Sequence, residues 1–583
     1  MIQERQTMLH FEFINKDGDM NPLSFVAPEE IIIARTVDEV VPCLQRIQKA
    51  VESGLYAAGY LTYEAAPAFD QTFTVNPNNK MPLLWFGLFR HPSELSKDEQ
   101  TNFFTVSKWD ADVSQDEYYR NIDNIKQYIK NGDTYQVNYT IRLHSLLKGD
   151  DFSFYKQLAK GQSANYCAYI STDEYSILSA SPELFFHLKD QLITTKPMKG
   201  TIQRGKTHVE DLANFQWLSD SVKNRSENLM IVDLIRNDLG QIAETGTVKV
   251  PHLFSIEKYP TVFQMTSTVT AQLSPKTSIA DIFVALFPCG SITGAPKIST
   301  MRIINELEDS PREVYCGAIG YITPEMEAIF NVPIRTVVVD KSSGQAVYGV
   351  GGGITWDSTA EEEYKEVLTK AMLLERLEPN FQLLESLYLK NGQYFLLNEH
   401  IERLKHSAEY FGFSIDIANM ELKLQDYAAK HRNNEEKVRV LLTEEGHISI
   451  EGQPLVPTPA VVDAVLADAP ISKENIFLYH KTTNRRIYSD RKDRFPNVYD
   501  VLLWNEEGEL TEFTTGNVVV EIEGEYLTPF VESGLLAGTF RKHLLEQKQI
   551  REEKLKLEDL KACSAIWLIN SVRQWVRVNL LME

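Results

Sequence analysis

The sequence predicts an α+β protein with at least two domains. At 583 residues the chain is too long for one ordinary hydrophobic core. Its first part contains many strand patterns and amphipathic helix patterns that do not alternate strictly, which indicates an α+β arrangement. Hydrophobic residues make up 43% of the chain and aromatic residues 10%, as is typical of a globular protein.

One domain boundary is visible near residue 380. The apolar spacing of residues 365–378 predicts a helix that Pro379 should stop. Residues 387–395 then show strand, Asn391-Gly392 turn and strand, a strong hairpin pattern. We therefore expect an N-terminal part at 1–110, a catalytic part of the same domain at 111–379, and a second domain at 380–583.

The charge balance and the cysteines narrow the class of protein. The chain has 59 basic and 81 acidic residues, a net charge of -22, which argues against a nucleic-acid partner because phosphate binding needs a basic face. Small anionic substrates need only a local cluster of cations. The five cysteines are scattered and have no CxxC or disulfide-rich spacing. Because neither a signal-peptide core nor a membrane-spanning run is present, we expect a soluble, cytoplasmic protein.

Three charged residues of one predicted helix share a face. Glu363, Glu366 and Lys370 are spaced at i, i+3 and i+7. Such spacing is also typical of a solvated salt-bridge stripe. Glu227 begins another apolar segment, and if it joined the two glutamates, a divalent cation such as Mg²⁺ would relieve their repulsion.

Lys199 is the most informative single residue. It lies between Pro197 and the Gly200-Thr201 step, a run that predicts a sharp turn able to aim an amine into a cavity. Most runs of this kind are ordinary surface turns. The surrounding motifs favour a functional role, because they occur in a characteristic order along residues 110–378. These motifs are Gly132–Asn138, Ser181–Glu183, Lys199–Thr201, Arg236–Gly240, Gly290–Lys297, Tyr315–Gly320, Ile334–Thr336 and Glu363–Glu366.

With these motifs, residues 110–378 resemble the chorismate-binding catalytic domain shared by anthranilate, isochorismate and aminodeoxychorismate synthases. The resemblance implies antiparallel sheets with helices outside, and Mg²⁺ held by Glu227 and Glu366 with support from Glu363. It implies that Glu183 is the general acid/base. The positions that it places around chorismate are Gly200, Thr201, Thr293, Tyr315, Arg335, Gly351, Gly352, Gly353 and Lys370.

Two positions separate the products that this family makes. Anthranilate synthases have Ala where this chain has Lys199, and the isochorismate-forming relatives have Lys where it has Gln136. The combination of Gln136 and Lys199 is similar to that of aminodeoxychorismate synthase component I. It implies that neutral Lys199 adds at C2 of chorismate as the C4 hydroxyl leaves, and that ammonia then attacks C4 and expels the lysine. Anthranilate synthase component I remains the alternative.

The sequence also bears on where the ammonia for this reaction comes from. The sequence contains no Gly-x-Cys-x-Gly segment of a glutaminase. The family's solution is a separate glutamine amidotransferase subunit, which we expect as a partner, with free ammonia as a poorer substitute.

A second lysine, Lys481, marks the second domain. The run His480–Arg486 could be a basic surface loop. It lies, however, between the motifs His400–Leu404 and Leu510–Asn517. With these motifs, residues 385–583 resemble the fold-type IV pyridoxal-phosphate enzymes, which implies a domain of two α/β subdomains. The resemblance implies that Lys481 carries the cofactor and that Glu512 faces its pyridinium nitrogen. The expected phosphate contacts are Arg403, the backbone of Thr539 and Phe540, and the hydroxyl of Ser571.

These anchors alone leave aminotransferase and lyase open. The runs Lys481–Arg485 and Asn570–Trp575 look more like aminodeoxychorismate lyase. A lyase would also consume the product of the first domain and release pyruvate and 4-aminobenzoate, in the folate branch. A class IV aminotransferase has no such link to the first step. The remaining alternative is a chain that has lost its activity and serves as a regulatory or scaffolding partner. Because fold-type IV enzymes are often dimers, the resemblance also suggests that this protein forms a homodimer through its second domain.

Overall fold

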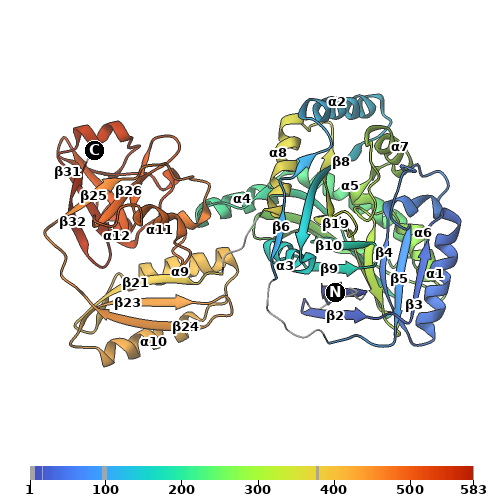
Figure 1. Cartoon of the computed structure of the whole chain (residues 1–583), viewed down its shortest axis with the longest axis horizontal. Helices are drawn as coiled ribbons and strands as arrows, with labels where there is room; N and C mark the ends of the chain where they lie inside the picture. The colour runs from blue at the N-terminus through green and yellow to red at the C-terminus, as the bar shows by residue number, and fades with distance from the viewer. Residues whose placement is uncertain (1–6, 16–17, 95–101, 376–379, 582–583) are drawn as a thin grey trace. The chain divides into compact units, whose positions relative to one another are not determined.

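The computed structural model describes residues 7–15, 18–94, 102–375 and 380–581 (Figure 1). The chain divides into two compact units. The first comprises Met1–Gln203 and Asn214–Glu378, and the second comprises Arg204–Ala213 and Pro379–Glu583. The assignment of Arg204–Ala213 to the second unit has no counterpart in the sequence-based expectation.

Two sheets form the framework of the first unit, and each has ten strands within the described residues. One sheet has the path β16 (Gly294–Ala295), β8 (Gln136–Gly149), β20 (Gln345–Ile354), β19 (Thr336–Asp340), β10 (Tyr175–Ser181), β9 (Tyr166–Ser171), β1 (Met8–Ile14) and β2 (Met20–Val26), with β6 (Phe104–Val106) and β7 (Asp110–Ala111) on β8. The other has β13 (Met198–Gln203), β15 (Val262–Gln272), β12 (Leu192–Lys196), β11 (Leu184–Lys189), β18 (Ala328–Asn331), β17 (Ala318–Ile322), β4 (Tyr56–Leu61), β5 (Leu84–Phe89) and β3 (Glu30–Ala34), with β14 (Lys249–Lys258) on β15.

The two sheets pack on one another through apolar side chains. Phe11 of β1, Tyr60 of β4 and Tyr321 of β17 belong to one buried cluster that joins both sheets. Helices cover the outer faces: α1 (Val37–Glu52) and α6 (Ile279–Leu286) pack against the second sheet, and α2 (Gln115–Asn131), α3 (Asp151–Gln162) and α7 (Lys297–Leu307) against the first. The predicted α+β arrangement of antiparallel sheets with outer helices is confirmed.

Two further helices carry charged residues of the first unit. Helix α5 (Val222–Gly240) begins at Ser221, whose hydroxyl accepts a hydrogen bond from the Asn224 backbone N–H. Helix α8 (Ala360–Ala371) begins at Thr359, which caps the Glu362 N–H, and three glutamates in its first turn suit the helix dipole. The helix predicted at 365–378 is thus α8, which begins earlier and passes into a 3-10 turn at Met372–Leu374; residues 376–379 lie outside the described residues.

The described residues of the second unit form two sheets. The smaller one pairs β22 (Gln393–Phe395), β21 (Leu383–Lys390), β23 (Glu435–Leu442) and β24 (Ile448–Pro454) under helices α9 (Leu397–Phe411) and α10 (Ile417–Lys430). The larger one runs β27 (Leu510–Phe513), β26 (Asp500–Trp504), β25 (Val461–Leu466), β32 (Gln574–Leu581), β31 (Ala565–Asn570), β28 (Gly516–Ile522), β29 (Glu525–Thr528) and β30 (Arg551–Glu552), with α11 (Arg486–Lys492) and α12 (Thr539–Glu546).

The local predictions for this unit are largely confirmed. Strands β21 and β22 form the hairpin with Lys390 opposite Gln393. The motif His400–Leu404 lies inside helix α9. The five cysteines are all free. In the described residues, no helix is both long and apolar enough to cross a lipid bilayer.

Candidate active sites

The first unit contains a cavity of about 470 Å³, the first cavity, between β8, β13, β20 and helices α5 and α8. It gathers nearly all residues that the sequence proposed for chorismate and metal. Those lining it are Glu183, Lys199, Gly200, Thr201, Glu227, Tyr315, Arg335, Gly351, Gly352, Gly353, Glu363, Glu366 and Lys370. Thr293 does not line it. Its side chain is fully buried and its hydroxyl donates to the carbonyl oxygens of Cys289 and Gly290, so it holds the backbone of that segment.

Lys199 lies in strand β13, not on the sharp turn that its sequence context predicts. The pairing of β13 with β15 shifts register between Met198 and Thr201, and Gly200 has φ +94°, so the strand is locally irregular there. Burial lowers the pKa of the Lys199 amine and Lys370 contributes to the decrease, while Glu227 and Glu183 oppose it. The net direction favours a neutral, nucleophilic amine.

Gln136 and Lys199 lie on the same side of Gly353, the side on which any other residue carries a Cβ atom. A Cβ atom on Gly353 would lie 1.9 Å from Gln136 Nε2 and 2.7 Å from Lys199 Nζ, so only glycine leaves room for both. The Gln136 side chain is completely buried, and neither of its amide atoms has a hydrogen-bond partner within the described residues. A buried amide in this state is suited to bind a polar ligand group.

Glu183 supplies a protonatable carboxyl group at the same cavity. Only 2% of the residue is exposed, and burial raises the pKa of its carboxyl to about 7, although Ser291 and Lys199 favour the charged form. Its Oε1 atom has no hydrogen-bond partner in the described part of the chain. Glu183 can therefore give or take a proton near neutral pH.

The three glutamates of the expected metal site also line the first cavity. Glu363 and Glu366 lie on the α8 face beside Gly352, where a Cβ atom would be 3.1 Å and 3.7 Å from their carboxylate oxygens. Burial and the charge of Glu366 raise the pKa of Glu363 to about 7, and burial raises the pKa of Glu227. Lys370 pairs with Glu366 at 2.6 Å. Over the described ranges, no three His, Cys, Asp or Glu side chains are arranged to hold a metal ion.

Several features of the first cavity were not predicted. Glycines 351 to 353 belong to strand β20, paired with β8, and do not form a turn. Gly349, on the same strand, makes room for Tyr315, because a Cβ there would lie 2.4 Å from the tyrosine ring. Ser291 and Trp217 also line the cavity. Ser291 lies within the motif Gly290–Lys297, whereas no motif of the sequence includes Trp217.

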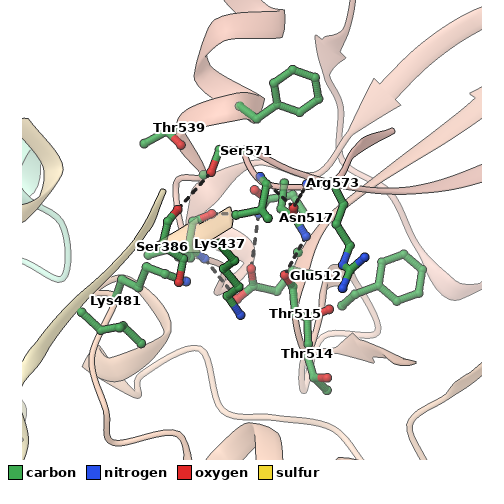
Figure 2. Close-up of a pocket in the computed structure, with 18 of the residues that line it drawn as sticks. Ser386, Lys437, Lys481, Glu512, Thr514, Thr515, Asn517, Thr539, Ser571 and Arg573 are labelled. Carbon is green, nitrogen blue, oxygen red and sulfur yellow. Dashed lines mark hydrogen bonds between the residues drawn. The ribbon is translucent and has the colours of Figure 1, made fainter. Parts of the chain in front are cut away.

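The second unit contains a cavity of about 450 Å³, the second cavity, which brings together all the residues expected to bind the cofactor. These are Arg403, Lys481, Glu512, Thr539, Phe540 and Ser571. Figure 2 shows Lys481 and Glu512 in this cavity, with Thr539 and Ser571 near the top of the view.

Lys481 has the properties of a reactive amine. Burial, followed by the charges of Arg403 and Arg485, lowers its pKa to about 7. Its backbone carbonyl accepts a hydrogen bond from the Leu384 N–H, which ties the loop to strand β21. Arg486, the last residue of the same basic run, has an 86% exposed side chain on helix α11 beside Asp490.

Glu512 is held rigidly by three donors. The hydroxyl of Tyr488 donates to its Oε1 at 2.7 Å, the Leu536 N–H donates to the same atom, and the Asn517 amide donates to Oε2. Burial raises the pKa of Glu512 to about 7. A fixed carboxylate of this kind can accept a hydrogen bond from a protonated ring nitrogen.

At the expected phosphate end, Arg403 has a partner that the prediction did not include. The guanidinium of Arg403 donates to Glu385 at 2.8 and 2.6 Å, and His400 contacts the same carboxylate at 2.6 Å. Arg403 is thus directed mainly at Glu385, whose role the sequence did not reveal. His400 in turn lies 3.2 Å from the Thr539 hydroxyl at the first turn of helix α12.

The start of α12 fits a phosphate group. Gly538 is the N-cap, and a Cβ on it would lie 2.0 Å from Asn517 Oδ1, so the backbone approaches closely there. The unpaired N–H groups of the first helical turn and the hydroxyls of Thr539 and Ser571 line the same end of the cavity. Lys481, Glu512 and this helix start together provide an amine, a carboxylate and an anion site that fit pyridoxal phosphate.

Comparisons with known proteins match a different enzyme family to each of the two units. Residues 14–376 match the chorismate binding enzyme family, and residues 382–581 match the amino-transferase class IV family, which implies pyridoxal phosphate. Aminodeoxychorismate synthase component 1 of Klebsiella aerogenes is 42% identical over 277 residues, covering 47% of this chain and 61% of that protein. The Escherichia coli (strain K12) protein of the same name is 40% identical over 280 residues, covering 48% and 61%.

The solved structures show the fold of the first unit. Anthranilate synthase component I from Streptococcus pneumoniae TIGR4 superposes with a TM-score of 0.50 at 24% identity, covering 64% of this chain and 93% of that one. The chain spans about three fifths of the length of the curated relatives named above.

Proposed function

Because the chain belongs to the chorismate binding enzyme family, we propose that it makes 4-aminobenzoate in two steps. The first cavity converts chorismate and ammonia to 4-amino-4-deoxychorismate and water. The second eliminates pyruvate from that product and leaves 4-aminobenzoate. The observation that carries the proposal is that Lys199 and Gln136 lie side by side at the position where a Cβ atom of residue 353 would be.

In the first cavity Lys199 is the nucleophile and Glu183 the acid. The neutral amine bonds to C2 of chorismate, the double bonds shift, and the C4 hydroxyl leaves as water with the proton from Glu183. Ammonia then bonds to C4 as the double bonds shift back, and the bond between C2 and Lys199 breaks. Arg335 and Tyr315 hold and orient the substrate, because a guanidinium suits bidentate binding of a carboxylate. Anthranilate formation is disfavoured because it leaves Lys199 without a role.

Glu227, Glu363 and Glu366 line one cavity, and although they are not drawn together into a metal-binding cluster within the described residues, they are the side chains that would hold Mg²⁺. Burial and the negative charge of Glu366 raise the pKa of Glu363, and burial and the same charge raise the pKa of Glu227; a divalent cation relieves repulsion of this kind. Bound there, Mg²⁺ would supply a positive charge for a carboxylate of chorismate. Lys370, which now pairs with Glu366, also donates to the Gly351 carbonyl at 2.7 Å and thereby braces strand β20 against helix α8.

In the second cavity the chain holds pyridoxal phosphate and moves one proton. The cofactor, when bound, acts as an electron sink. Lys481 supplies the amine that carries it and, once free, takes the proton from the substrate carbon that bears the amine. Glu512 keeps the ring nitrogen protonated. The N–H groups of Thr539 and Phe540, with the Ser571 hydroxyl, bind the phosphate, and Arg403 acts mainly by fixing Glu385.

The partner and the setting are part of the same proposal. The chain has no glutaminase motif, so a separate glutamine amidotransferase would supply ammonia in the cytoplasm, and the second unit would form a homodimer. A direct test incubates the full chain with chorismate, ammonium and Mg²⁺ in the absence of pyridoxal phosphate. We expect 4-amino-4-deoxychorismate to accumulate, whereas anthranilate as the product would refute the assignment of the first cavity.

A further inference from the structure

The second cavity carries more positive charge than the cofactor needs. Among the residues that line it, six are basic and one, Glu512, is acidic, although the whole chain has a net charge of -22. The basic residues are Arg403, Lys437, Arg439, Lys481, Arg485 and Arg573. Such a local reversal of sign selects anions.

Three of these six cations already have a role. Lys481 carries the cofactor, Arg403 is paired with Glu385, and Arg485 donates to the Thr514 carbonyl and stacks on the Tyr488 ring at 4.6 Å. The phosphate end lies at Thr539 and Ser571, which have their own donors. Lys437, Arg439 and Arg573 therefore remain unassigned.

Strand β23 presents Lys437 and Arg439 on one face. The residues between and beside them, Glu436, Val438 and Val440, are buried on the opposite face, as the period of two in a strand requires. Both cations line the cavity, and neither has a hydrogen bond or an ion pair with any other described side chain. Burial and the neighbouring charges of Arg439, Arg573 and Arg485 lower the pKa of Lys437, as expected for a cation with no counter-charge.

Arg573 completes the group from another element. It follows Ser571 in the loop between β31 and β32, and its Nη1 donates to the Val456 carbonyl at 2.9 Å and to the Thr458 hydroxyl, which fixes the side chain. Figure 2 shows Arg573 and Lys437 among the residues around the same cavity.

We propose that Lys437, Arg439 and Arg573 form a subsite for the carboxylates of a dicarboxylate substrate. A monocarboxylate amino acid would bring one negative charge to three unassigned cations. The intermediate 4-amino-4-deoxychorismate brings two carboxylates, one on the ring and one on the enolpyruvyl group. This inference rests on the proposed function. It assigns the choice between a lyase of this dicarboxylate and an aminotransferase of monocarboxylate amino acids to the three cations, because the residues that hold the cofactor serve both kinds of enzyme.

The test measures binding apart from catalysis. The full chain loaded with pyridoxal phosphate, in an Arg335→Ala background that weakens binding at the first cavity, is titrated calorimetrically with benzene-1,3-dicarboxylate and with benzoate. We expect the dicarboxylate to bind at least about tenfold more tightly, and Lys437→Gln or Arg439→Gln to weaken it about tenfold or more, because each removes a charged hydrogen-bond donor. Lys405→Gln, which removes an exposed cation of helix α9 outside the cavity, should change nothing.

Two further readouts separate the outcomes. The affinity for pyridoxal phosphate should be equal in all variants; a loss in Lys437→Gln or Arg439→Gln would assign these cations to the cofactor phosphate and overturn the proposal. Equal binding of the two probes would also overturn it. If the dicarboxylate preference holds but the wild-type chain does not convert 4-amino-4-deoxychorismate, the subsite stands and the proposed function fails.

Discussion

The side chains of Lys199 and Gln136 meet at Gly353. A Cβ atom on this glycine would lie 2.7 Å from Lys199 Nζ and 1.9 Å from Gln136 Nε2. Gln136 comes from the start of β8 and Lys199 from β13, so the two residues that distinguish the products of this family belong to different sheets. Strand β20 lies beside β8 and brings Gly353 against both side chains.

Gly353→Ala should abolish most of the first reaction. The new methyl group would displace Lys199 and Gln136, and a misplacement of about 1 Å at a reacting group costs on the order of 100-fold in rate. Initial rates of 4-amino-4-deoxychorismate formation measure this. Gly240→Ala is the matched control, since a Cβ there has no atom within 4 Å. A first-step rate within twofold of wild type in Gly353→Ala would contradict this geometry.

Lys199→Ala should eliminate the first step and leave the second intact. The variant lacks the amine that bonds to C2, but the second unit is unchanged. Supplying 4-amino-4-deoxychorismate directly and following pyruvate release measures the second step. If chorismate were still aminated at C4 at the wild-type rate, Lys199 would not be the nucleophile.

The first reaction should slow as pH rises through about 7. Glu183 must be protonated to act as the acid, its pKa is raised to about 7, and the protonated form predominates below that pH. Glu183→Gln should lower kcat by about 100-fold or more and remove this descending limb from the kcat profile. A limb that persists in Glu183→Gln would belong to another group.

Pyridoxal phosphate should load faster as pH rises through about 7. The pKa of Lys481 is lowered to about 7, and only the neutral amine, which predominates above that pH, reacts with the aldehyde of the cofactor. Stopped-flow absorbance of the cofactor-free chain follows this loading. Lys481→Ala should lose the covalent absorbance and accumulate 4-amino-4-deoxychorismate from chorismate, and unchanged 4-aminobenzoate output from that variant would rule out this role.

Removal of divalent metal should stop the first step alone. EDTA would leave the repelling carboxylates of Glu227, Glu363 and Glu366 without a counter-charge, and added Mg²⁺ should restore activity. Pyruvate release from added 4-amino-4-deoxychorismate should be insensitive to EDTA. First-step turnover that survives complete metal removal would argue against a magnesium site.

Sequence patterns located the residues better than they located the geometry around them. Lys199 was expected on a turn because Pro197 and Gly200 flank it, but long-range pairing with β15 turns this segment into an irregular strand. Thr293 belongs to a motif of the site, yet its hydroxyl bonds to backbone within its own loop. Motif membership does not reveal which way a side chain points.

Contacts between distant segments could not be predicted from one sequence. Nothing local shows that Glu385 on β21 accepts the guanidinium of Arg403 on α9, or that Gly349 leaves room for the Tyr315 ring. Lys437 and Arg439 carry no motif. They became visible only when the fold placed them in a cavity with one carboxylate.

The most direct test of the account is product analysis with the complete chain. The wild-type protein is given chorismate, ammonium, Mg²⁺ and pyridoxal phosphate, and the aromatic products are separated and quantified together with pyruvate. The account predicts 4-aminobenzoate and pyruvate in equal amounts. Anthranilate as the aromatic product would contradict it.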